Sequence, residues 1–112
     1  MTDPVARALA AFSSRRSASR SRLIVALDKS ENGAMLAREL AHECGMDAGR
    51  LQQVMFGDGV DFSTERSPIA LGQVTTRETP HGLLYEITPA GRDEARRLQR
   101  EAFWERGRGR RR

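Results

Sequence analysis

The sequence has a single cysteine and no long apolar run, and these two absences restrict the classes of protein that it can represent. Cys44 is the one cysteine among 112 residues, so an internal disulfide is impossible and a reducing compartment suits the chain. The longest apolar runs, 8–12 and 23–27, have five residues each, whereas crossing a bilayer takes roughly 18–20. The sequence therefore predicts a cytoplasmic protein without a membrane span.

Residues suited to catalysis or metal binding are also few. His42 and His81 are the two histidines, and no Cys-x-x-Cys or His-x-x-x-His spacing indicates a zinc site. Gly57 and Gly59 follow a predicted helix instead of a strand, and no Lys-Ser or Lys-Thr pair comes after them to complete a phosphate-binding loop. Carboxylates are numerous, but their spacing selects no catalytic pair. We predict no enzyme active site, no metal, no cofactor and no small-molecule ligand.

Positive charge is concentrated at the two ends of the chain. Residues 1–22 and 105–112 each contain five arginines and one carboxylate, a net charge of +4 apiece. Residues 23–104 contain nine basic and thirteen acidic side chains, a net charge of −4. Basic arms attract nucleic acid through counterion release, largely regardless of its sequence. The alternative is that the terminal arginines only keep a small protein soluble.

The pattern of apolar residues predicts a mostly helical α+β fold with one hairpin. Pro89 directly after Thr88 is typical of a helix start, and Asp47 is suited to capping the helix that follows it. The expected helices are 4–12, 20–30, 34–44, 48–56 and 89–104, and the expected strands are 73–77 and 83–88, joined by a loop over 78–82. This predicts an N-terminal helix and Ser/Arg-rich linker (1–19), one folded domain (20–104) and a flexible Arg/Gly-rich tail (105–112).

Two of these helices are joined by a short glycine-containing turn at 45–47, which is typical of a helix-turn-helix motif. The second helix of such a motif enters the major groove of DNA with its exposed face. Arginine can bind guanine and glutamine can bind adenine through two hydrogen bonds each, and small residues let backbone N–H groups approach a phosphate. The alternative is an ordinary solvated helix face. The residues expected to contact DNA here are Ala48, Gly49, Arg50, Gln52 and Gln53.

Two stretches resemble winged helix-turn-helix transcriptional regulators of the MarR, PadR and ArsR kinds. Residues 38–46, RELAHECGM, resemble the first helix of their helix-turn-helix, and residues 82–92, GLLYEITPAGR, resemble their second wing strand and the start of the last helix. The resemblance covers residues 20–104 and implies a wing at 73–88 whose tip touches the minor groove or the DNA backbone. The matching positions are Arg77, His81 and Gly82. For Arg77 the alternative is an exposed strand charge paired with Glu78 or Glu86.

The chain departs from these regulators in two places. They usually have serine or threonine at the N-cap of the first helix of the motif, where this chain has Leu36. They also pass almost directly from the recognition helix into the wing, whereas here residues 57–70 intervene and carry Asp58, Asp61 and Glu65. Carboxylates beside a recognition helix repel phosphates, so this insert is expected either to fold away from DNA or to bind a protein partner.

These observations predict a double-stranded DNA-binding transcriptional regulator that associates with the nucleoid. Its C-terminal arginines are expected to follow phosphates or lie in a minor groove; they are Arg106, Arg108, Arg110, Arg111 and Arg112. A homodimer through the N-terminal and last helices is expected, because two-fold symmetry doubles the groove contacts. The alternatives are a protein-interaction module that uses the acidic insert, and a sequence-nonspecific RNA- or nucleoid-binding protein that relies on its basic ends.

Overall fold

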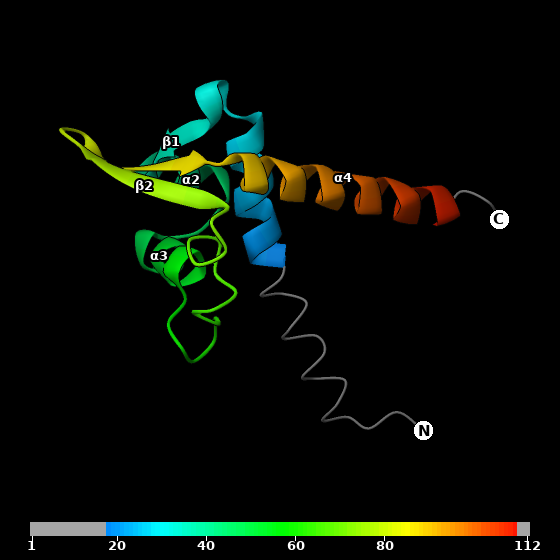
Figure 1. Ribbon diagram of the computed structural model, residues 1–112, viewed down its shortest axis with the longest axis horizontal. Helices are drawn as coiled ribbons and strands as arrows, with labels where there is room; N and C mark the ends of the chain where they lie inside the picture. The colour runs from blue at the N-terminus through cyan, green and yellow to red at the C-terminus, as the bar shows by residue number, and fades with distance from the viewer. Residues whose placement is uncertain (1–17, 110–112) are drawn as a thin grey trace.

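The computed structural model describes residues 18–109, with side chains as far as Phe103. The predicted helix over 4–12 and the arginines at 110–112 lie outside the described residues. A helix over 18–29 is followed by η1 (Glu31–Gly33), β1 (Ala34–Leu36), α2 (Ala37–Glu43), α3 (Ala48–Phe56), β2 (Val74–Thr79), β3 (Gly82–Ile87) and α4 (Pro89–Gly109). The strands form one antiparallel sheet in the order β1-β3-β2 (Figure 1). The fold is α+β and mostly helical, in the winged-helix-like arrangement that the sequence predicts.

The short strand β1 differs from the prediction, which places residues 34–36 at the start of a helix over 34–44. The chain turns at Asn32 and Gly33, which both have positive φ, and then pairs with β3 in the register Ala34↔Glu86 to Leu36↔Leu84. The helix begins only at Ala37. The first helix of the helix-turn-helix therefore has seven residues, and pairing with a strand about fifty positions away overrides the local helical pattern.

The hairpin is present, with a tighter connection than predicted. Thr79 pairs with Gly82, which leaves Pro80 and His81 as the turn instead of a loop over 78–82. The Thr79 hydroxyl accepts a hydrogen bond from the His81 N–H (3.1 Å) and donates one to the Gly82 carbonyl (2.7 Å). The threonine side chain thus supplies the polar contacts that a two-residue connection needs.

The core lies between the sheet and the helices. The side chains predicted for it from the helical spacing are buried: Leu23 and Leu27 on the helix over 18–29, and Leu51, Val54 and Met55 on α3. Tyr85 of β3 is 2% exposed and packs its ring against Phe56 of α3, with centroids 6.3 Å apart. Burial of each such side chain stabilises the fold by about 1.5–3 kcal/mol relative to exposure.

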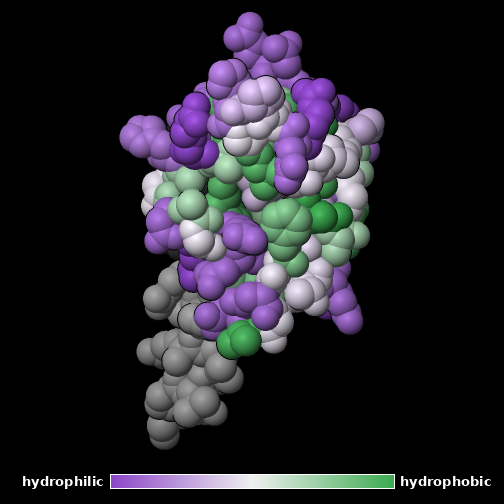
Figure 2. Space-filling model, turned by 90° about the vertical axis from the view of Figure 1, so that its left-hand side faces the viewer, coloured by the Kyte–Doolittle hydropathy of each residue, from purple (hydrophilic) through white to green (hydrophobic). Residues whose placement is uncertain are grey.

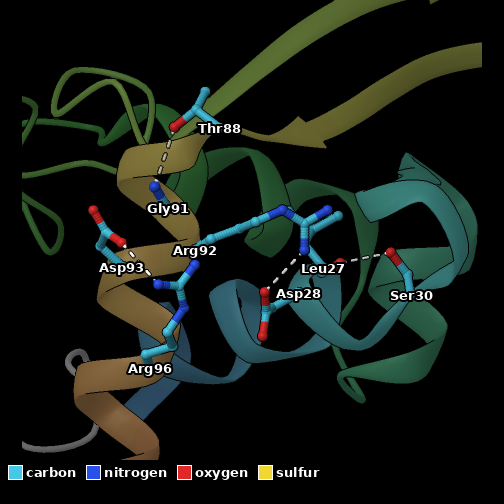
Figure 3. A network of polar contacts seen from close by, with 8 residues as sticks. All are labelled: Leu27, Asp28, Ser30, Thr88, Gly91, Arg92, Asp93 and Arg96. Atoms are coloured by element: carbon cyan, nitrogen blue, oxygen red, sulfur yellow. Dashed lines mark hydrogen bonds and ion pairs between the residues drawn. The ribbon is translucent and has the colours of Figure 1, made fainter.

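Two polar contacts, drawn in Figure 3, and one close backbone approach hold the passage from β3 into α4. The Thr88 hydroxyl caps α4 by accepting the Gly91 N–H at 3.1 Å. Gly91 lies so close to the preceding loop that a Cβ atom there would be 2.2 Å from the carbonyl oxygen of Gln73. Arg92 then forms a 3.1 Å ion pair with Asp28 on the helix over 18–29. The run Thr-Pro-Ala-Gly-Arg therefore joins the sheet, the first described helix and the last helix.

Helix α4 extends beyond the rest of the molecule (Figure 1). Ala95 is buried and Leu98 is partly buried, whereas Phe103 is 66% exposed. Arg97 forms ion pairs along the helix with Glu94 and Glu101. The helix continues to Gly109, beyond the end at residue 104 that the sequence predicts, and the flexibility expected for 105–112 stays a prediction. Arginine is a good helix former and ion pairs three or four residues apart support an existing helix, which outweighs the interruption by single glycines.

No helix in residues 18–109 is both long and apolar enough to span a membrane.

Candidate nucleic-acid interface

Helix α3 has the bounds that the sequence predicts, and its polar face is open. The Asp47 carboxylate caps it by accepting the Arg50 N–H at 2.8 Å, and the preceding turn uses Gly45 at positive φ. Its apolar row, Leu51, Val54 and Met55, is at most 1% exposed. The five residues predicted to contact DNA are all exposed: Ala48, Gly49, Arg50, Gln52 and Gln53.

The stretch after α3 folds back against the body without covering this face. Gly57 makes the turn at positive φ, and a Cβ atom there would be 2.5 Å from Cα of Thr64. Phe62 is 2% exposed and joins the core, and Ser67 and Pro68 are buried as well. The insert therefore packs against the body, and both outcomes expected for it, a position away from DNA and the binding of a protein partner, stay predictions.

Asp58 organises the tip of this insert. Its carboxylate accepts hydrogen bonds from the N–H groups of Val60, Asp61 and Phe62, each at 2.9 Å. The bonds from Phe62 and Val60 lower the pKa of Asp58 below its usual value. Val60, between these residues, is 82% exposed. The tip is therefore a fixed acidic turn that presents one apolar side chain to solvent.

Arg50 is a predicted contact residue whose side chain touches the insert. Its guanidinium carbon lies over the Phe62 ring, 4.7 Å from the ring centroid. The Arg50 residue as a whole nevertheless remains exposed. A cation in this position is attracted by the negative face of the ring, so the contact restrains the arginine without removing it from the surface. Nothing in the local sequence indicated this pair.

The wing residues are placed in two different ways. His81 and Gly82 are exposed at the hairpin tip, where Gly82 has a φ of 119° that favours glycine. Arg77 is opposite Leu84, one step from the pair Thr76↔Tyr85. Because neighbouring residues of a strand point to opposite sheet faces, Arg77 lies on the face away from the Tyr85 ring and α3. The structure thus does not bring Arg77 together with the predicted α3 contacts.

Arg38 on α2 is not among the predicted site residues, yet it reaches the wing. Its guanidinium Nη1 donates a hydrogen bond to the carbonyl oxygen of His81 at 3.0 Å. Arg38 is in the stretch that resembles winged-helix regulators, but only the tertiary structure brings it to the hairpin tip.

The hairpin tip and α3 lie on one side of the molecule, and α4 extends toward the other (Figure 1). Figure 2 views the side of the hairpin and α3, where hydrophilic residues surround a central apolar area. Phe56 of α3 is among the large apolar residues that reach the surface, at 36% exposed. Arg106 and Arg108 belong to the last turns of α4, so the structure separates them from the α3 residues.

Cys44 and His42 occupy two different environments. Cys44 is 2% exposed and burial raises the pKa of its thiol, while Arg22 donates to its carbonyl oxygen at 3.2 Å. His42 is exposed on α2. Within residues 18–109, His, Cys, Asp and Glu side chains form no group of three that could hold a metal ion.

These elements define the class: a small α+β protein in which a helix-turn-helix is combined with a three-stranded sheet in a winged-helix-like arrangement. The family model of the EarA-like proteins matches residues 11–98, so the chain belongs to the EarA-like family. The match does not assign it to the MarR, PadR or ArsR regulators. No curated protein and no solved structure matched the chain.

Proposed function

We propose that this protein is a DNA-binding transcriptional regulator of the winged helix-turn-helix type that reads double-stranded DNA with α3. The supporting observation is the division of α3 into two faces. Leu51, Val54 and Met55 fix the helix to the core, while the polar residues between them remain exposed. A helix with its side chains is about 10–12 Å across, and a major groove about 12 Å wide accepts it.

In this proposal the α3 side chains have separate roles. Gln52 and Gln53 carry amides that can bind adenine edges, and Arg50 can bind guanine. Ala48 and Gly49 allow the first turn to come close to a phosphate. These residues give sequence preference, in the manner of the MarR, PadR and ArsR regulators that the chain resembles.

The wing and the basic ends would contact the DNA outside the groove occupied by α3. His81 and Gly82 are at the exposed hairpin tip and are suited to the adjacent minor groove or backbone. Arg77, on the outer sheet face, is suited to a phosphate only. Because residues 23–104 carry a net charge of −4, we attribute most of the salt-dependent affinity and the association with the nucleoid to the terminal arginines.

A two-fold dimer completes the proposal. Phe103 is 66% exposed on the part of α4 that extends beyond the body, and such a surface is available for a second copy. Two copies would place their recognition helices about 34 Å apart, one DNA turn. Light scattering with and without a duplex of two inverted half-sites tests this, and a persistent monomer on such a duplex would contradict it.

The test of function begins with selection of duplexes from a random pool by the chain of residues 1–112, followed by gel shifts at increasing salt. Arg50→Ala combined with Gln53→Ala should abolish the preference for the selected sequence while leaving weak, salt-sensitive binding. Arg66→Ala is the matched control, because it removes one positive charge as Arg50→Ala does, and Arg66 is exposed and lies outside α3, the hairpin and α4. Deletion of 105–112 should lower the affinity for all sequences and reduce the slope of log K against log salt by about 0.9 for each phosphate that the tail neutralises.

Other outcomes would favour other functions. Binding that depends only on the terminal arginines, with no enriched sequence or with RNA bound equally well, supports a sequence-nonspecific nucleic-acid-binding protein. Failure to bind any duplex supports a protein-interaction module. The observation that favours this module is Val60, which is 82% exposed on the acidic turn at Asp58.

A further inference from the structure

We infer that Phe62 is a positioning residue for Arg50 and makes it selective for guanine. The inference rests on the proposed function and adds to it the part played by the insert between α3 and β2. The Arg50 guanidinium carbon is 4.7 Å from the centroid of the Phe62 ring. Phe62 comes from the insert, which supplies a contact that a direct passage from α3 into β2 would not provide.

The geometry leaves the donors of Arg50 usable. The guanidinium is planar and its N–H groups point outward in that plane. A ring against the cation holds the side chain in few conformers while the groups directed at solvent remain free to meet the two acceptors of guanine. The Asp47 carboxylate takes the backbone N–H of Arg50, so the polar cap of α3 does not use the guanidinium.

The ring is itself held firmly. Phe62 is 2% exposed, and its N–H donates to the Asp58 carboxylate at 2.9 Å. Its carbonyl oxygen accepts from the N–H groups of Asp58 (3.1 Å) and Gly59 (3.0 Å). The backbone on both sides of the aromatic ring is therefore fixed, and the ring restricts Arg50 before any ligand arrives.

This arrangement also gives the acidic insert a role at the candidate interface. A carboxylate beside DNA repels phosphates, but the Asp58 carboxylate accepts hydrogen bonds from three backbone N–H groups, which offset part of its charge. A carboxylate used in this way fixes a loop and holds the aromatic ring under Arg50. In this proposal the insert contributes to the selectivity for guanine by positioning Arg50, and the terminal arginines supply most of the affinity for DNA.

The test compares two duplexes: one selected with the wild-type chain, and the same duplex with the guanine that Arg50 protects replaced by adenine. Phe62→Leu keeps an apolar side chain in the core and removes the ring, and it should reduce the affinity ratio between the two duplexes by about tenfold. The slope of affinity against salt should stay unchanged, since the charge of Arg50 is retained. Asp58→Ala, at an exposed residue, loosens the same loop without altering the core and should reduce the ratio in the same direction.

The outcomes separate the two proposals. If the wild-type chain selects no sequence, the proposed function fails and the inference fails with it. If the wild type prefers guanine and both folded variants keep its ratio, only the inference is overturned. The contact between Arg50 and Phe62 can also be measured by NMR in the absence of DNA. The chemical shifts of the Arg50 side-chain protons should include a ring-current contribution that disappears in Phe62→Leu. If Phe62→Leu does not fold, an unchanged ratio in Asp58→Ala overturns the inference.

Discussion

The guanidinium of Arg38 donates a hydrogen bond to the backbone carbonyl of His81, with Nη1 and the oxygen 3.0 Å apart. This contact joins the first turn of α2 to the tip of the β2–β3 hairpin, two elements 43 positions apart in the sequence. A hairpin tip held only by its own turn would move independently of the body. Here the orientation of the tip is linked to the helix-turn-helix.

We therefore expect Arg38→Ala to loosen the hairpin tip with little effect on the whole fold. The amide of His81, which donates to the Thr79 hydroxyl, should exchange faster with solvent. The free energy of unfolding should fall by about 1 kcal/mol or less, because the contact is exposed. Hydrogen exchange followed by NMR measures both effects. Arg77→Ala, also exposed in the hairpin, is the control, and equal exchange in the two variants would show that Arg38 does not hold the tip.

Gly91→Ala should destabilise the protein strongly. The added Cβ would be 2.2 Å from the Gln73 carbonyl oxygen and 2.6 Å from Cγ1 of Ile87, so backbone must move, at a cost of about 1–3 kcal/mol or more. Gly49→Ala, in the first turn of α3, is the matched control. Its Cβ would meet only the Asp47 carboxylate at 3.4 Å, and alanine is up to about 1 kcal/mol better than glycine within a helix. Urea unfolding of both variants gives the comparison, and a Gly91→Ala protein as stable as Gly49→Ala would contradict the close approach.

Asp47→Ala should cost about 1 kcal/mol in the free energy of unfolding, because the Arg50 N–H loses its acceptor at the start of α3. Asp47→Asn keeps an oxygen at the same position and should retain most of the stability. Thermal unfolding of the two variants measures the difference. Equal losses would mean that the negative charge, rather than the hydrogen bond, stabilises the first turn.

Asp58 should make the stability of the protein depend on pH in the acid range. Its pKa in the folded state lies below the usual value of 3.8 because backbone N–H groups donate to the carboxylate. A lowered folded pKa adds stability above the unfolded pKa, and this contribution is lost as the pH falls through the folded pKa. We expect wild-type stability to decline more steeply than that of Asp58→Asn between about pH 4 and the folded pKa. Urea midpoints measured from about pH 5 downward in both proteins provide the test, and parallel curves would contradict it.

The sequence allowed accurate prediction wherever local signals agreed. Helix α3 is predicted with its observed ends because Asp47 caps it, Gly57 ends it and its apolar residues recur at helical spacing. The start of α4 at Pro89, after the capping Thr88, is predicted for the same reason. In both cases a few neighbouring residues determine the geometry.

Features that depend on contacts between residues far apart in the sequence could not be predicted from local sequence patterns. Residues 34–36 have a helix-like composition, and they form β1 because β3 offers unpaired backbone groups along that edge. Phe62 belongs to the insert over 57–70, where no local pattern shows that its ring meets both the core and Arg50. Arg38 is part of a helix motif in the sequence, and its bond to His81 requires the folded hairpin.

The direction of α4 has a practical consequence for experiments on this protein. A dye, affinity tag or surface linker attached at the last residues of α4 would sit at the end of a helix that extends away from α3 and the hairpin. The N-terminal side is different, since Ser19 and Arg22 line one cavity of about 360 Å³ with Asp47 and Arg50. Attachment at the end of α4 should therefore leave the α3 face accessible, whereas a bulky group attached at Ser19 would crowd it.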